Sequence, residues 1–65
     1  MNKQSLIDTA MLKYPKARKI AVENFTMGYD SLSMEAGMNL SADTRAYGWK
    51  APTVNAIRFV LRGGR

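Results

Sequence analysis

Cysteine and histidine are both absent from this chain of 65 residues. Without cysteine there is no disulfide and no thiolate metal site, and without histidine the commonest general base and metal ligand are missing. The acidic residues are few and are spaced singly along the sequence: Asp8, Glu23, Asp30, Glu35 and Asp43. We therefore expect no metal ion, no cofactor and no catalytic site, and we interpret the chain as a binding module and not an enzyme.

Long apolar runs are also absent. The N-terminal residues do not form the apolar segment of a signal peptide, and no stretch reaches the length of a membrane span. We therefore expect a soluble, cytoplasmic protein. Residues 1–65 suffice for one small domain, which buries only about 60% of the surface that its unfolded chain exposes. An oligomer or a bound partner would help to stabilise so small a core.

Basic residues outnumber acidic ones, with ten Lys and Arg against five Asp and Glu and a net charge of +5. This surplus favours polyanionic partners: nucleic acid first, an acidic protein surface second and anionic lipid third. The same net charge is also ordinary for a soluble small domain. The placement of the charges is therefore more informative than their sum.

Helical spacing of apolar residues, interrupted by glycine and proline, predicts an all-α fold. We expect a compact bundle of four to five short helices with a helix-turn-helix-like C-terminal half. The expected helices cover about residues 2–13, 15–27, 31–36, 42–47 and 53–62. Their expected caps and breaks are Asn2 or Ser5, Pro15, Gly28, Asp30 or Ser31, Gly37, Ser41 and Gly48. Residues 63–65 are expected to form a flexible tail.

The last of these segments is open to two interpretations. Residues 53–61 are rich in β-branched and aromatic residues, which are typical of a strand. Four apolar residues nevertheless fall on one helical face: Val54, Ile57, Val60 and Leu61. Pro52 also suits the first turn of a helix, and we predict a helix.

Residues 43–61 combine the residue types needed where two helices pack across a tight turn. Gly48 tolerates a positive φ, and Thr44 is small enough for a contact between helices. Apolar residues flank the glycine and anchor the second helix: Tyr47, Trp49, Val54 and Ile57. With these residues the segment resembles a helix-turn-helix DNA-binding motif. Asp43 departs from the pattern, which usually has an aliphatic residue there.

The stretch Gly-Trp-Lys-Ala-Pro-Thr-Val at residues 48–54 also looks like the start of the recognition helix in LexA-type winged-helix repressors. The resemblance implies duplex DNA as the partner. Asn and Arg read adenine and guanine through paired hydrogen bonds, so Asn55 and Arg58 are the expected base contacts. Other polar and cationic residues are expected to contact the DNA, mostly at its phosphates. They are Lys16, Arg18, Lys19, Lys50, Thr53, Arg62 and Arg65.

These features predict a small transcriptional regulator that occupies a short operator. We expect it to act as a homodimer, because two-fold pairing doubles the phosphate contacts. The alternative is a protein-binding factor of the kind that phages and plasmids encode, which blocks or bridges a larger partner. Its interface would be an apolar patch around Met34, Met38 and Phe59. Phe59 could instead be tucked under the N-terminal helices, which we favour. RNA binding is a third interpretation, and a merely solvated helix face a fourth.

Overall fold

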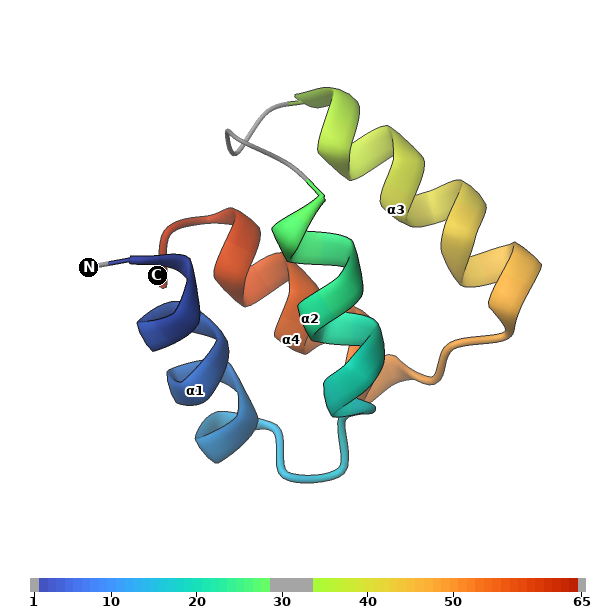
Figure 1. Cartoon of the computed structure of the whole chain (residues 1–65). Coiled ribbons are helices and arrows are strands. Elements are labelled where there is room, and N and C mark those ends of the chain that lie inside the picture. The colour runs from blue at the N-terminus through green and yellow to red at the C-terminus, as the bar shows by residue number, and fades with distance from the viewer. Residues whose placement is uncertain (1, 29–33, 65) are drawn as a thin grey trace.

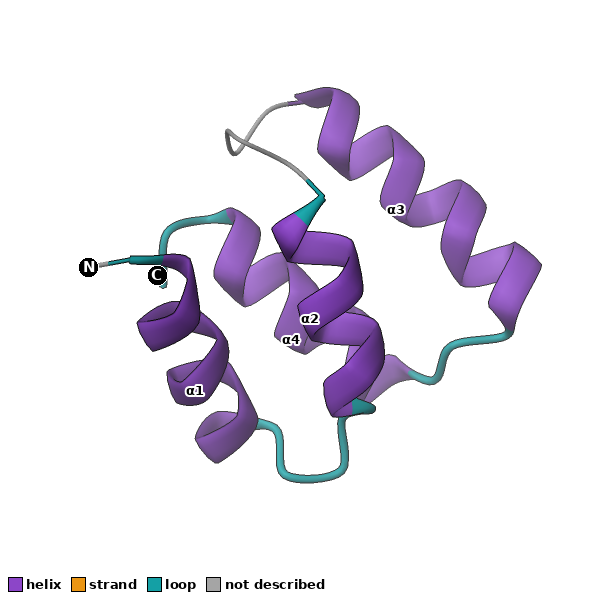
Figure 2. Ribbon diagram, viewed as in Figure 1, coloured by secondary structure: helices purple, strands orange, loops and turns teal. Residues whose placement is uncertain are grey.

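The computed structural model describes residues 2–28 and 34–64, and for residues 34–38 it describes the backbone alone. Four helices make up this part of the chain: α1 (Lys3–Lys13), α2 (Lys19–Met27), α3 (Met34–Tyr47) and α4 (Ala51–Leu61). Helices and loops are the only structure drawn for these residues in Figure 2, and the predicted all-α class with four to five helices is confirmed. Across the described ranges, no helix is both long enough and apolar enough to cross a membrane.

α1 begins and ends where the sequence predicts. The Asn2 side chain accepts a hydrogen bond from the Ser5 backbone N–H at 2.8 Å and so caps the helix. At the other end the N–H of Tyr14 donates to the carbonyl of Ala10 at 2.8 Å. Pro15 follows directly, and the residue before a proline avoids helical angles. Local sequence therefore sets both ends of α1.

α2 starts later than the sequence predicts. The expectation that Pro15 opens the helix is wrong, because the helix begins at Lys19 after an extended N-cap residue, Arg18. The N–H of Ala17 donates to the carbonyl of Tyr14 at 2.9 Å and closes a turn between the two helices. Ala17 is buried in the core, so tertiary packing holds these residues in a turn. Gly28 caps the end of α2, as predicted.

α3 is one continuous helix where the sequence predicts two. Neither Gly37 nor Ser41 interrupts it. A glycine inside a helix costs only about 1 kcal/mol relative to alanine, and the burial of Leu40 in the core offsets such a cost. The other expected caps, Asp30 and Ser31, lie outside the described residues. Gly48, with φ +62°, ends the helix as expected.

α4 is the central helix of the bundle. It contacts α1, α2 and α3, and Figure 1 shows it behind α2 with α1 and α3 on either side. The predicted helix at residues 53–61 is confirmed, and Ala56, Ile57 and Val60 are fully buried. The hydrophobic core comprises Leu6, Ile7, Ala10, Ala17, Val22, Phe25, Leu40, Ala56, Ile57, Phe59 and Val60.

The first two residues of the predicted tail, Gly63 and Gly64, are hydrogen-bonded to the end of α4. The N–H of Gly63 donates to Val60 O, and the N–H of Gly64 donates to Phe59 O, each at 2.9 Å. Gly63 and Gly64 have φ of 74° and 82°. This pair of bonds is the Schellman motif, which satisfies the last carbonyls of a helix. Arg65 lies outside the described residues.

Candidate nucleic-acid interface

α4 exposes one narrow strip of side chains. Asn55, Arg58 and Arg62 are exposed, as are Ala51 and the N-cap residue Lys50. Residues 51, 55, 58 and 62 are separated by three or four positions, so they fall on one face of a helix. The opposite side of α4 is buried. The strip therefore holds one amide and two guanidinium groups, side chains suited to hydrogen-bonding base edges or phosphates.

The charge of the chain is unevenly distributed. Residues 1–43 contain five of the ten basic residues and all five acidic ones, so their side-chain charges balance. Residues 44–65 contain the other five basic residues and no acidic one. The whole surplus of positive charge thus belongs to the segment that forms the end of α3, the turn, α4 and the C-terminus.

The turn before α2 lies against the start of α4. The backbone N–H of Arg18 donates to Oγ1 of Thr53 at 2.8 Å. Lys16, Arg18 and Lys19 are exposed around this contact. The structure thus brings part of the predicted phosphate-binding set to the first turn of α4, next to Lys50.

Thr53 does not fit its predicted place on the DNA-binding face. It is only 4% exposed, and its hydroxyl already accepts the Arg18 bond. The reason is that α4 is packed on several sides, so its exposed strip is narrower than the sequence pattern suggests. Thr53 links two elements of the fold.

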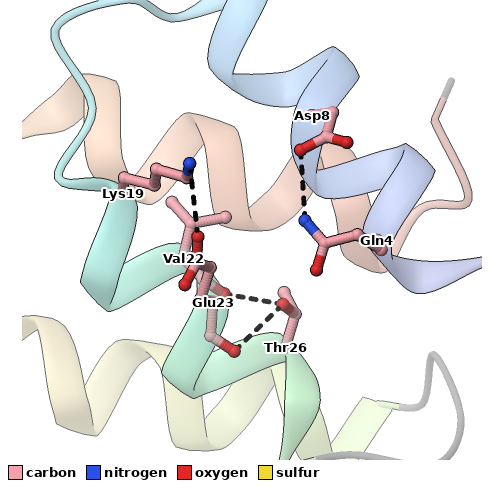
Figure 3. Close-up of polar contacts among 6 residues, drawn as sticks. All are labelled: Gln4, Asp8, Lys19, Val22, Glu23 and Thr26. Carbon is pink, nitrogen blue, oxygen red and sulfur yellow. Dashed lines mark hydrogen bonds and ion pairs between the residues drawn. The ribbon is translucent and has the colours of Figure 1, made fainter.

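Lys19 is the one cation of this group with an ion pair within residues 2–28 and 39–64. Its Nζ lies 3.7 Å from Oε1 of Glu23, and the two side chains are 63% and 36% exposed. Exposed ion pairs at i,i+4 contribute little to stability and are screened by salt. The Lys19 ammonium can therefore leave Glu23 and bind another anion. Figure 3 shows the pair, together with the bonds from Gln4 to Asp8 and from Thr26 to Val22 and Glu23. Asp8 and Glu23 thus each contact a residue four positions away in their own helix.

Phe59 belongs to the core, as favoured from the sequence, and not to an exposed protein-binding patch. It is 5% exposed and meets the Tyr14 ring edge-on, with centroids 6.4 Å apart. The Lys13 ammonium lies over the Phe59 ring, 5.0 Å from its centroid. The side chains of Met34 and Met38, the other residues of that predicted patch, lie outside the description.

A groove between α2 and α3 is a further feature that the sequence did not predict. Its volume is about 370 Å³. Its lining includes charged, polar, apolar and aromatic side chains: Arg18, Ile20, Asn24, Asp43, Tyr47 and Trp49. Tyr47 stacks on Trp49 at a centroid distance of 5.5 Å, and Trp49 meets Phe25 edge-on at 6.0 Å. These residues lie in two separate stretches, 18–25 and 43–49, so no local pattern signals the groove.

Comparison of the chain with protein-family models, with curated proteins and with solved structures finds no match. The functional argument therefore depends on the geometry and charge of the described residues.

Proposed function

We propose that the chain binds duplex DNA through α4 and acts as a small regulator by occupying a short operator. The observation that carries this proposal is the exposed strip of Asn55, Arg58 and Arg62 in a segment without acidic residues. An α-helix fits the major groove of B-DNA, where Asn pairs with adenine and Arg with guanine. Asn55 and Arg58 are the side chains assigned to base edges.

The surrounding cations suit phosphate contacts. Lys50 precedes α4, and the bond from Arg18 to Thr53 keeps the cationic α1–α2 turn beside the first turn of that helix. No acidic residue occupies the first turn of α4, so nothing there opposes the positive end of the helix dipole. Lys16, Arg18, Lys19, Lys50 and Arg62 would therefore position the protein on the backbone without reading sequence. Arg65 would extend this set at the C-terminus.

A two-fold homodimer is part of the proposal. One module of this size makes few phosphate contacts, and each contact contributes through the release of counterions. Two copies on half-sites one helical turn apart would double the number of contacts and the length of sequence that is read. The expected operator is therefore a short palindrome.

The proposal is tested by titrating the protein into labelled random-sequence duplex DNA at about 50 mM and about 200 mM salt. We expect binding that weakens steeply with salt. Each neutralised phosphate contributes about −0.9 to the slope of log K against log salt, so five contacts per protomer give about −4.5. Absence of binding at the lower salt concentration would refute the proposal. A sequence selection from a random duplex pool then identifies the operator.

A further inference from the structure

Three polar side chains in the groove between α2 and α3 have no partner among the described residues. They are the guanidinium of Arg18, the amide of Asn24 and the carboxylate of Asp43, and all three line the groove. Asp43 is half-buried, in the second half of α3. A carboxylate taken partly out of water is stabilised by a hydrogen-bond donor. The groove thus offers an acceptor, an amide and a cation to an occupant.

The aromatic wall of the groove includes one ring that is largely exposed to solvent. Tyr47 stacks on Trp49 with an interplanar angle of 24°, yet it remains 67% exposed. The tyrosine therefore contacts Trp49 and still leaves most of its side chain open to solvent. Phe25, edge-on to Trp49, supports the pair from the core. An open aromatic face held in place by a second ring is a platform on which a planar group can stack.

We propose that this groove binds an unpaired guanine of a single-stranded nucleic acid. The base would stack on Tyr47, and the carboxylate of Asp43 would accept hydrogen bonds from its Watson–Crick edge. Guanine presents two adjacent N–H donors there, from N1 and from the 2-amino group, which match the two oxygens of one carboxylate. Arg18 would contact a neighbouring phosphate. Unpaired bases are recognised in this way, by stacking and by hydrogen bonds to their edges.

Other occupants fit the groove less well. A cationic side chain would suit Asp43 and the aromatic rings, but Arg18 in the same groove and a net charge of +5 oppose it. An apolar side chain from a protein partner would cover Asp43, Asn24 and Arg18 without giving them hydrogen bonds, which is unfavourable. The volume of about 370 Å³ is in the range of small-ligand sites. Stacking, edge recognition and charge therefore all favour a base with its phosphate.

Trp49 provides a direct readout, because it is the sole tryptophan of the chain and it lines the groove. We would titrate the protein with an oligothymidylate of eight nucleotides that carries one central guanine, and follow tryptophan fluorescence. We expect saturable quenching. The same oligonucleotide with hypoxanthine at that position lacks the 2-amino donor and should bind several-fold more weakly. All-thymine oligonucleotide should bind more weakly still.

Two groove variants and one control make the test specific. Tyr47→Ala removes the platform and should weaken binding by about 5–150-fold, the effect of losing one base–aromatic stack. Asp43→Ala should abolish the preference for guanine over hypoxanthine and leave the affinity for all-thymine oligonucleotide unchanged. Neither side chain belongs to the hydrophobic core, so circular dichroism should show a retained fold. Leu12→Ala, at an exposed leucine on α1 outside the groove, should change nothing.

The outcome separates this proposal from duplex binding by α4. Arg58→Ala should weaken duplex binding and leave the guanine-dependent quenching intact, since Arg58 does not line the groove. Unchanged fluorescence with the guanine oligonucleotide, or equal affinities for the original protein and Tyr47→Ala, would overturn the proposal. An apolar side chain of a protein partner would then be the better occupant. Loss of duplex binding with retained guanine-dependent quenching would contradict the proposed function but not the groove proposal.

Discussion

The backbone N–H of Arg18 and the hydroxyl of Thr53 are joined by a hydrogen bond of 2.8 Å across 35 positions of the sequence. The bond attaches the turn between α1 and α2 to the first turn of α4. It explains why α2 starts at Lys19 and why Thr53 points inward. It also holds the cations of the turn beside the helix to which we assign DNA binding.

Thr53→Val tests this link. Valine has nearly the same shape as threonine but cannot accept the bond, so the partly buried N–H of Arg18 loses its partner. We expect the free energy of unfolding, measured with urea, to fall by about 1–3 kcal/mol. The matched control is Thr9→Val, where an exposed hydroxyl bonds within its own helix to Ser5 O. That variant should stay within about 0.5 kcal/mol, and an equal loss in both would contradict the prediction.

Gly48→Ala tests the turn before α4. Gly48 has φ +62°, and a Cβ there would meet no atom within 4 Å. Any loss is therefore due to the left-handed backbone, which costs a residue with Cβ about 1–2 kcal/mol. Gly28→Ala is the control, because Gly28 has φ −75° and its new Cβ would make ordinary contacts at 3.5 Å. Thermal unfolding should show a lower Tm for Gly48→Ala only.

Phe59→Ala separates a core role from an interface role. Removing a buried phenylalanine costs about 3–5 kcal/mol, while a domain of this length has about 3–10 kcal/mol of total stability. We expect the free energy of unfolding, measured with urea, to fall by about 3–5 kcal/mol. Leu12→Ala, at a leucine that is 84% exposed, should leave stability within about 0.5 kcal/mol. A Phe59→Ala protein that lost no more stability than Leu12→Ala would contradict the core role of Phe59.

Arg58→Ala tests base reading by α4. If Arg58 contacts a guanine in two places, its loss should weaken binding to the selected operator by about 1–3 kcal/mol and relax the preference at one base pair. Fluorescence anisotropy on the operator and on its single-base variants measures both effects. Arg45→Ala removes an equal charge from an exposed position on α3, and it should keep the base preference. An identical response of the two variants would argue against base reading by Arg58.

Arg62→Ala tests the phosphate assignment. A residue that neutralises one phosphate should weaken binding to all duplexes about equally and reduce the salt slope by about 0.9. The measurement is the titration series over salt, made on two unrelated sequences. A change in sequence preference without a change in slope would assign Arg62 to a base instead.

The groove was not predicted from the sequence, although several of its lining residues were considered there. Trp49 was expected chiefly as a core residue and Tyr47 as an apolar residue before a turn. Trp49 does pack against the core, but Tyr47 is 67% exposed. The groove forms because α2 and α3 both pack against α4, which places Asp43 in the same groove as Arg18 and Asn24. Sequence periodicity describes each helix separately, so it does not indicate which residues of two different helices line the same groove.

Some features of this protein were determined by the sequence alone. The Asn2 cap and Pro15 set the ends of α1, Gly48 ends α3, and the spacing of Val54, Ile57 and Val60 makes residues 53–61 a helix. These are local effects of backbone geometry and of a single apolar face, which is why they could be predicted. The net charge of +5 likewise needs no structure.

Other features were decided only by the tertiary structure. Burial of Leu40 accompanies a single α3 that passes through Gly37, and the contact with Thr53 fixes the start of α2. Contacts with α1, α2 and α3 bury Thr53 and Phe59 along with Ile57 and Val60 of the predicted stripe. They leave Asn55, Arg58 and Arg62 as the exposed polar strip of α4. The physical reason is that burial depends on how many neighbours surround a helix, and that number is set by the whole fold.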